Sequence, residues 1–214
     1  MTPRRITVAA ATTPGAILLT VVLAFAATAA PTASPIYACP LPSTGTDPTA
    51  DTPDPGCDAT PADTDWIAPV TAPIGSGFRT ADRPHHNGVD LLAARGTVIR
   101  AASSGVVSVV RCNTTPVSWG CDRDGGEQIL GCGWYVDITH PGNPVVVTRY
   151  CHMQSQPIVV EGQQVAAGQP LGRVGSSGNS TGPHLHFEVH LGGHDSGSAV
   201  SPVGFMIDHG APLG

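Results

Sequence analysis

In one short segment of the sequence, every second position is polar, and three of these four residues are histidines. Residues 183–191 read Pro-His-Leu-His-Phe-Glu-Val-His-Leu, so polar and apolar side chains alternate. This alternation predicts a half-buried β-strand whose polar face carries His184, His186, Glu188 and His190. Two histidines at i and i+2 lie about 7 Å apart at Cα, close enough to converge on one metal ion or its bound water. A polar stripe that faces solvent is the alternative, and the pair alone does not decide between them.

Two earlier segments carry residues of the same kind. Residues 86–90 read His-Asn-Gly-Val-Asp, and this imidazole and carboxylate can ligate one divalent ion if Gly88 lets the backbone bend. A later strand histidine, His152, shares a strand face with Tyr150. His85 is expected to be a solvated neighbour. Each segment alone also has an ordinary structural explanation.

Taken together and in this order, the three segments resemble the M23 peptidases, the LytM or lysostaphin-type family. The resemblance runs from about Gly75 to Glu188 and includes Gly-x-x-Gly-x-Ser-Thr-Gly-Pro-His-Leu-His-Phe-Glu. It implies an all-β fold, a mostly antiparallel sheet with an open groove. Carried over position by position, it implies three zinc ligands, His86, Asp90 and His186, and two catalytic histidines, His152 and His184. All five positions keep the required residue type, which favours catalysis, because several family members that have lost ligands act as binding or activating proteins.

The chemistry implied by the resemblance centres on one Zn²⁺ ion. Three protein ligands leave a fourth position for water, whose pKa zinc lowers from ~15.7 toward ~7. The sequence has no His-Glu-x-x-His motif, so we expect His152 or His184 to accept the water proton and the other to stabilise the oxyanion. The predicted function is a zinc-dependent endopeptidase that hydrolyses stem peptides or cross-bridges of bacterial peptidoglycan. The alternatives are a non-catalytic module that binds wall or activates another hydrolase and, less favoured, a structural zinc domain.

The remaining polar residues of interest have simpler interpretations. Glu188 could steady a ligand imidazole, but we expect it to face solvent. No Gly-x-Ser-x-Gly elbow is present, so Gly-Ser-rich turns explain Ser176, Ser177 and Ser180 better than a serine nucleophile does. Four histidines without a motif are expected to be exposed: His140, His190, His194 and His209.

The chain divides by composition into three parts. Residues 1–30 have a basic start and a short apolar run, as in a secretory signal peptide; an uncleaved anchor is the alternative, although a span needs ~20 apolar residues. Twin-arginine export and a lipoprotein cysteine are minority options. Residues 31–63 form a Pro/Thr/Asp-rich linker, and 64–214 the catalytic domain. There, β-branched runs between turn residues predict strands at 98–99, 106–110, 135–139, 145–150 and 184–191.

Six cysteines in a chain expected to be exported favour disulfides, although 15 pairings are possible. We expect the pairs Cys39–Cys57, Cys112–Cys121 and Cys132–Cys151. The segment from Cys112 to Cys132 is longer than the family pattern leads us to expect. It predicts a disulfide-braced loop beside the groove, either a plain surface insertion or a wall that shapes substrate choice.

Charge excludes one class of partner. All ten basic residues are arginine, against 16 acids. Removing the signal with its two arginines leaves 8 against 16, a formal charge of −8. Such a chain has little attraction for nucleic acid or anionic membrane, and nucleic acid is therefore not expected as a partner. We expect a secreted, wall-associated protein without a stable membrane span, whose partners are peptidoglycan peptides.

Overall fold

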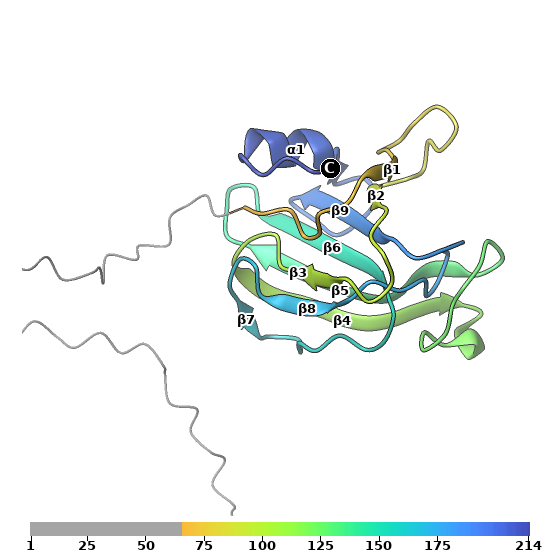
Figure 1. The fold of residues 1–214 in the computed structure, drawn as a ribbon. Coiled ribbons are helices and arrows are strands. Elements are labelled where there is room, and N and C mark those ends of the chain that lie inside the picture. The colour runs from red at the N-terminus through yellow and green to blue at the C-terminus, as the bar shows by residue number, and fades with distance from the viewer. Residues whose placement is uncertain (1–65) are drawn as a thin grey trace, which may run out of the picture. The chain divides into compact units, whose positions relative to one another are not determined.

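The computed structural model describes residues 66–214, which contain ten strands and one short α-helix (Figure 1). The predicted signal peptide, the linker and the Cys39–Cys57 pair lie outside the described residues. All strand pairs are antiparallel, so the all-β prediction is confirmed. No helix among residues 66–214 has the length and apolar character needed to cross a bilayer.

One large sheet organises the domain, with strand order β1-β2-β9-β6-β5-β4-β7. Its strands are β1 (Ile74–Ser76), β2 (Val89–Leu91), β4 (Gly105–Thr115), β5 (Leu130–His140), β6 (Val146–Met153), β7 (Gln164–Val165) and β9 (Leu185–Leu191). The short strand β10 (Ala199–Val200) pairs with β9. Strands β3 (Val98–Arg100) and β8 (Pro170–Arg173) form a separate two-stranded sheet. All five predicted strand segments are found, with ends shifted by a few residues.

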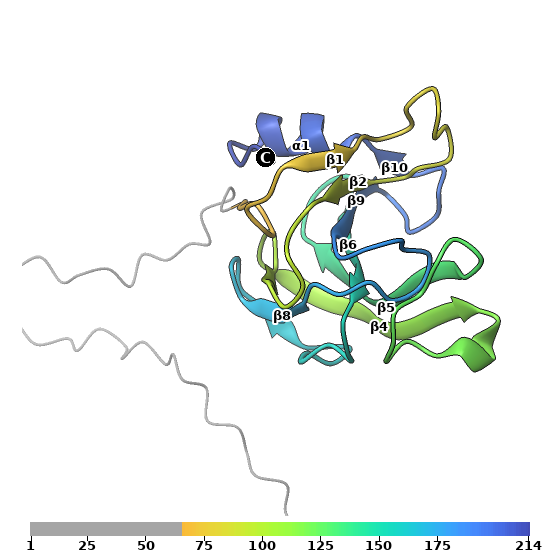
Figure 2. The ribbon, with the colours of Figure 1, turned by 45° about the vertical axis from the view of Figure 1, so that its right-hand side comes forward.

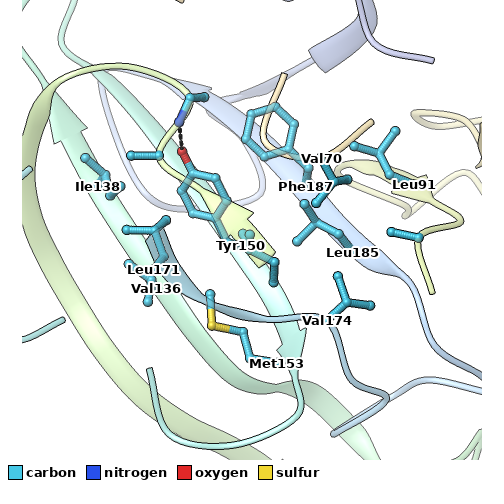
Figure 3. Close-up of a cluster of buried hydrophobic side chains, with 14 of the residues drawn as sticks. Val70, Leu91, Val136, Ile138, Tyr150, Met153, Leu171, Val174, Leu185 and Phe187 are labelled. Carbon is cyan, nitrogen blue, oxygen red and sulfur yellow. Dashed lines mark hydrogen bonds between the residues drawn. The ribbon is translucent and has the colours of Figure 1, made fainter. Parts of the chain in front are cut away.

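The core packs between the large sheet and the β3–β8 pair. Figure 3 shows Leu171 of β8 facing Val136 and Ile138 of β5, with Tyr150 and Met153 of β6 beside them. The Tyr150 hydroxyl is fully buried, and it accepts a hydrogen bond from the Ala102 N–H at 2.8 Å. Because buried polar groups are costly unless they are hydrogen-bonded, this contact lets a tyrosine serve as a core residue. The core thereby fixes β6 and β9, the strands that carry the candidate site.

Two elements outside the sheets complete the described fold. A single 3₁₀ turn (η1, Val117–Trp119) lies in the connection between β4 and β5. The helix α1 (Pro202–Asp208) begins with proline at its first turn, and the Ser201 hydroxyl accepts from the Gly204 N–H. Both are common signals of a helix start.

Strand β9 is buried on both faces, so the prediction of a half-buried strand was wrong. Leu185, Phe187 and Val189 point into the core, as the alternation predicted. The opposite face, with His186, Glu188 and His190, is also buried. The chain that follows β9 covers that face: the His190 ring contacts the Asp195 carbonyl at 3.0 Å. The polar face of β9 is therefore buried, and its side chains His186, Glu188 and His190 are hydrogen-bonded to one another.

Both testable disulfide predictions are confirmed. Cys112 pairs with Cys121, and Cys132 of β5 pairs with Cys151 of β6. The segment between Cys112 and Cys132 is only partly a loop, because β4 and β5 continue into it as an extended hairpin.

Candidate metal centre and groove

Three predicted ligands converge where β2 meets β9. Asp90 and His186 stand opposite each other in the ladder between these strands, and His86 lies in the turn before β2. The His86 Nε2 is 3.0 Å from Asp90 Oδ1 and 3.0 Å from His186 Nδ1. His186 Nδ1 lies 2.9 Å from the same Asp90 oxygen. The three side chains are buried and form a group that could hold a metal ion.

Hydrogen bonds on the outer sides of these groups orient their inward atoms. The His86 Nδ1–H donates to the Gly77 carbonyl at 2.7 Å, which leaves Nε2 as an acceptor. The Arg83 guanidinium donates to Asp90 Oδ2 at 2.8 Å, so Oδ1 alone faces the two imidazoles. Each group thus presents one lone pair inward. Around a tetrahedral Zn²⁺ with metal–ligand distances of about 2.0–2.1 Å, the ligand atoms are expected about 3.3 Å apart. The separations of 2.9–3.0 Å between the three inward atoms are close to that value, so this donor set fits zinc.

The electrostatics of the cluster also favour a cation. Burial raises the pKa of Asp90, but hydrogen bonds with His184, His186 and His86 outweigh burial and hold that pKa well below its usual range. Burial lowers the pKa of His186, yet the carboxylates of Asp90 and Glu188 outweigh it and raise the pKa to about 9. Ionised carboxylates on both sides of the His186 ring therefore stabilise positive charge there, carried by a proton or a metal ion.

The two predicted catalytic histidines stand beside this cluster. His152 is the last residue but one of β6 and has φ 63°, a left-handed conformation that residues other than glycine seldom adopt. Its ring lies 4.8 Å from that of His184 and 5.7 Å from that of His186, between centroids. The structure therefore brings all five predicted site residues together.

Backbone carbonyls orient both of these rings. The His152 Nδ1–H donates to the Ser177 carbonyl at 2.8 Å, and the His184 Nδ1–H donates to the Gly182 carbonyl at 2.9 Å. His184 Nε2 lies 3.5 Å from Asp90 Oδ1. Burial, followed by the neighbouring imidazoles of His186 and His184, lowers the pKa of His152 to about 3. The lowered pKa keeps the His152 ring neutral, and the Nδ1–H bond leaves the lone pair on Nε2.

Glu188 does not face solvent, contrary to our expectation. It is 6% exposed, and its carboxylate accepts from His186 Nε2 at 2.9 Å and from His190 Nε2 at 2.6 Å. Arg149 donates to it at 3.2 Å and pairs at 2.7 Å with the buried carboxylate of Asp137. Burial raises the pKa of Glu188, but its partners outweigh burial and lower that pKa. Glu188 therefore fixes the His186 ring from behind and leaves His186 Nδ1 free to face Asp90.

Two other histidines were wrongly expected to be exposed. His140 is buried between the Ser104 carbonyl and the Thr148 hydroxyl, each 2.8 Å from a ring nitrogen. His190 is buried beside Glu188. Both are structural residues whose nitrogens are all paired. His194 and His85 are exposed as expected, whereas His209 is partly buried and stacks on Phe205, with ring centroids 4.0 Å apart.

Gly88 is needed for a close approach rather than for a bend. A Cβ at this position would lie 2.4 Å from the Phe187 carbonyl oxygen and 2.8 Å from Cε1 of His186. Only glycine lets the turn before β2 pack directly against β9. The three serines are buried turn residues, as expected; the Ser177 hydroxyl donates to the Met153 carbonyl.

An open groove of about 930 Å³ exposes the cluster to solvent. The groove is lined by the turn before β2, including Arg83 and His85, and by the five site residues. The segment from Cys112 to Cys132 borders the groove through four residues: Asn113, Glu127, Gly131 and Cys132. It therefore has the placement that the wall hypothesis requires.

The sequence analysis missed several groups that orient the site. The carbonyls of Gly77, Ser177 and Gly182 hold three of the imidazoles, and no side-chain pattern could reveal them, since every residue has a carbonyl. Arg83, which holds Asp90, did have a signal: it is a basic residue three positions before His86.

Comparisons with known proteins find sequences similar to this chain. The family model for peptidase family M23 matches residues 84–202. Peptidoglycan DD-endopeptidase ShyC of Vibrio cholerae is 35% identical over 108 residues, 50% of this chain and 21% of that protein. DD-carboxypeptidase/endopeptidase Mpg of Neisseria meningitidis is 36% identical over 124 residues, 57% of this chain and 23% of that protein. The match thus spans less than a quarter of either relative.

A solved structure extends the comparison to the fold. The antimicrobial peptidase lysostaphin from Staphylococcus simulans superposes with a TM-score of 0.53 and 27% identity. The match covers 70% of this chain and 55% of that one.

Proposed function

Since this chain belongs to peptidase family M23, we propose that it is a zinc-dependent endopeptidase that hydrolyses peptide bonds in bacterial peptidoglycan. The observation that carries the proposal is the convergence of His86 Nε2, Asp90 Oδ1 and His186 Nδ1 within 3.0 Å of one another at the floor of a groove. The printed names of ShyC and Mpg support wall peptide as the substrate. When bound, zinc would make a water molecule acidic near neutral pH and polarise the scissile carbonyl.

The two remaining histidines would divide the proton chemistry. His152 makes one hydrogen bond through Nδ1 and is neutral, so its Nε2 takes the proton of the attacking water. The water oxygen then bonds to the carbonyl carbon, which becomes tetrahedral. His184 holds its Nδ1–H on the Gly182 carbonyl, so it would act as an imidazolium and donate its Nε2–H, now 3.5 Å from Asp90 Oδ1, to the developing oxyanion. The C–N bond then breaks, and the proton on His152 passes to the leaving amine.

The test is digestion of chemically defined peptidoglycans with the full chain, followed by mass spectrometry of the released fragments. New amine and carboxylate termini at a single type of peptide bond support the proposal and identify that bond. Binding to the wall without any released fragment would contradict it and favour the non-catalytic, wall-binding alternative.

Removal of metal is expected to abolish fragment release. A chelator should remove about one zinc per chain, and one equivalent of zinc should restore activity, because only one group of ligands converges among residues 66–214. Metal analysis and fragment release are measured on the same samples. Full activity of the metal-free protein would overturn the assignment of the cluster.

Replacing Glu188 with glutamine is expected to weaken zinc affinity by about 10- to 100-fold, the usual effect of losing a partner that orients a ligand histidine. The amide would remove the charge that His186, His190 and Arg149 now share. Competition with a chelator of known affinity measures the change. Glu161→Gln is the control, since this exposed carboxylate contacts Val110 N–H outside the groove. Unchanged affinity in Glu188→Gln would show that the carboxylate does not orient the ligand.

We further propose that residues 1–30 direct export, that 31–63 link this segment to the domain, and that 64–214 form the catalytic domain of a secreted, wall-associated enzyme. The N-terminal sequence of the exported protein tests the cleavage step, because an uncleaved anchor would retain Met1 or Thr2.

A further inference from the structure

One loop orients the two histidines that we propose act in catalysis, His152 and His184. Residues 176–182 connect β8 to β9 and supply the Ser177 carbonyl for His152 and the Gly182 carbonyl for His184. The Ser180 hydroxyl also lies 3.4 Å from the His184 ring. The position of this loop therefore decides where the two imidazoles point.

The cysteine-bracketed segment, residues 112–132, binds this loop through its backbone. The Gly125 N–H donates to the Ser176 carbonyl at 2.8 Å, and the Gly126 N–H donates to the Gly178 carbonyl at 3.1 Å. In the other direction, the Asn179 N–H donates to the Gly131 carbonyl at 2.8 Å. In Figure 2 the blue chain that leads into β9 passes beside the end of the β4–β5 hairpin. Three hydrogen bonds thus fasten the loop to the segment.

The contact is too close for any side chain to intervene. A Cβ on Gly125 would lie 1.6 Å from the Gly178 carbonyl oxygen. A Cβ on Gly133, just beyond the segment, would lie 2.1 Å from the Ser177 hydroxyl oxygen. Such distances require glycine and transmit any shift of the segment directly to the loop.

The segment is itself held firmly. The Cys112–Cys121 disulfide closes its first part. The Arg95 guanidinium pairs with both oxygens of Asp124 at 2.9 and 2.7 Å, which ties the segment to the turn before β3. The Trp134 Nε1–H donates to Asp122 at 2.7 Å. One internal disulfide and two side-chain contacts to neighbouring residues therefore restrain the segment.

We infer that the cysteine-bracketed segment is a positioning element for His152 and His184: it holds the 176–182 loop in register with the metal centre. The inference rests on the proposed function of those histidines. It replaces the expectation of a plain insertion with a structural role in catalysis. Because a displacement of about 1 Å can cost about 100-fold in rate, a small movement of this loop would be felt in turnover.

The test substitutes Gly125→Ala in the full, zinc-loaded chain, with a cross-linked muropeptide dimer as substrate. The new methyl group must push the loop away, so kcat should fall about 10- to 100-fold while KM changes less than about 2-fold and one zinc stays bound. Gly126→Ala is the matched control, since its Cβ would meet only the flexible end of Gln128. Equal kcat in Gly125→Ala and the wild type would overturn the inference.

A second readout does not depend on activity. Long-range ¹H–¹⁵N spectra of the zinc-loaded chain should show His152 as the pure Nδ1–H tautomer, with the signal assigned by its loss in His152→Gln. Gly125→Ala should mix the tautomers as the Ser177 carbonyl moves away, and Gly126→Ala should not. This result stands even if the wild type cleaves no muropeptide, so failure of the proposed function and failure of this inference are distinguishable.

A second variant covers the case in which Gly125→Ala does not fold. Cys112→Ser combined with Cys121→Ser loosens the segment without adding a clash. This double variant should also lower kcat, by a smaller factor than Gly125→Ala. A folded double variant with wild-type kcat and an unmixed His152 tautomer would overturn the inference.

Discussion

Replacing His184 with alanine is expected to lower turnover by about 100- to 10,000-fold while one zinc stays bound. His184 Nε2 reaches toward the cluster at 3.5 Å from Asp90 Oδ1, but the three atoms that lie 2.9–3.0 Å apart belong to other residues. The substitution therefore removes a donor from the groove and leaves the ligand set intact. Fragment release from muropeptides gives the rate, and metal analysis gives the zinc content.

His85→Ala is the matched control for this experiment. His85 is exposed, lines the same groove and lies next to the proposed ligand His86 in sequence, yet it makes no hydrogen bond within residues 66–214. Its loss should change the rate by less than about 2-fold. If His184→Ala loses its zinc together with its activity, His184 is a ligand and the division of roles above is wrong.

The residues of the site were predictable because they lie in patterned segments. Alternation along residues 184–191 predicted that His186 and Glu188 share a face, and the strand does present both on the side opposite Phe187. The predicted Cys132–Cys151 pair joins β5 and β6, which are consecutive strands and antiparallel neighbours in the sheet. These are local signals, whereas the long-range contact between His86 and His186 was expected only from the resemblance to the M23 family.

What the sequence did not reveal depends on what packs over each residue. Glu188 and His190 alternate with apolar neighbours as surface residues do, but Arg149 of β6 contacts Glu188 and the chain after β9 contacts His190. His140 has no motif, yet a core position between Ser104 and Thr148 satisfies both of its nitrogens. The contact of Gly125 with Gly178 joins segments 53 positions apart, and neither glycine carries a side chain whose pattern could predict it. Burial and backbone contacts of this kind are properties of the assembled fold.

Asp90→Asn is expected to abolish both zinc binding and turnover. The single oxygen Oδ1 of Asp90 lies 3.0 Å from His86 Nε2 and 2.9 Å from His186 Nδ1, so it joins the two imidazoles. Asparagine keeps the shape but replaces an anionic oxygen with a neutral amide, whose NH₂ would have to face either the Arg83 guanidinium or the inward ring nitrogens. The guanidinium is itself a hydrogen-bond donor, so an NH₂ group cannot accept from it. Toward the ring nitrogens, an NH₂ group would occupy the lone pairs that should bind the metal. Metal analysis and fragment release give the two readouts, and thermal unfolding verifies that the variant folds.

Asp82→Asn provides the comparison, because this exposed carboxylate lines the same groove and its loss changes the net charge equally. It should keep its zinc and nearly all of its activity. The two large-effect substitutions then separate two roles that activity alone would confuse. His184→Ala should yield a zinc-loaded, inactive protein, whereas Asp90→Asn should yield a folded protein without metal. Full zinc occupancy in Asp90→Asn would mean that other residues hold the ion, and the assignment of His86, Asp90 and His186 as its ligands would be wrong.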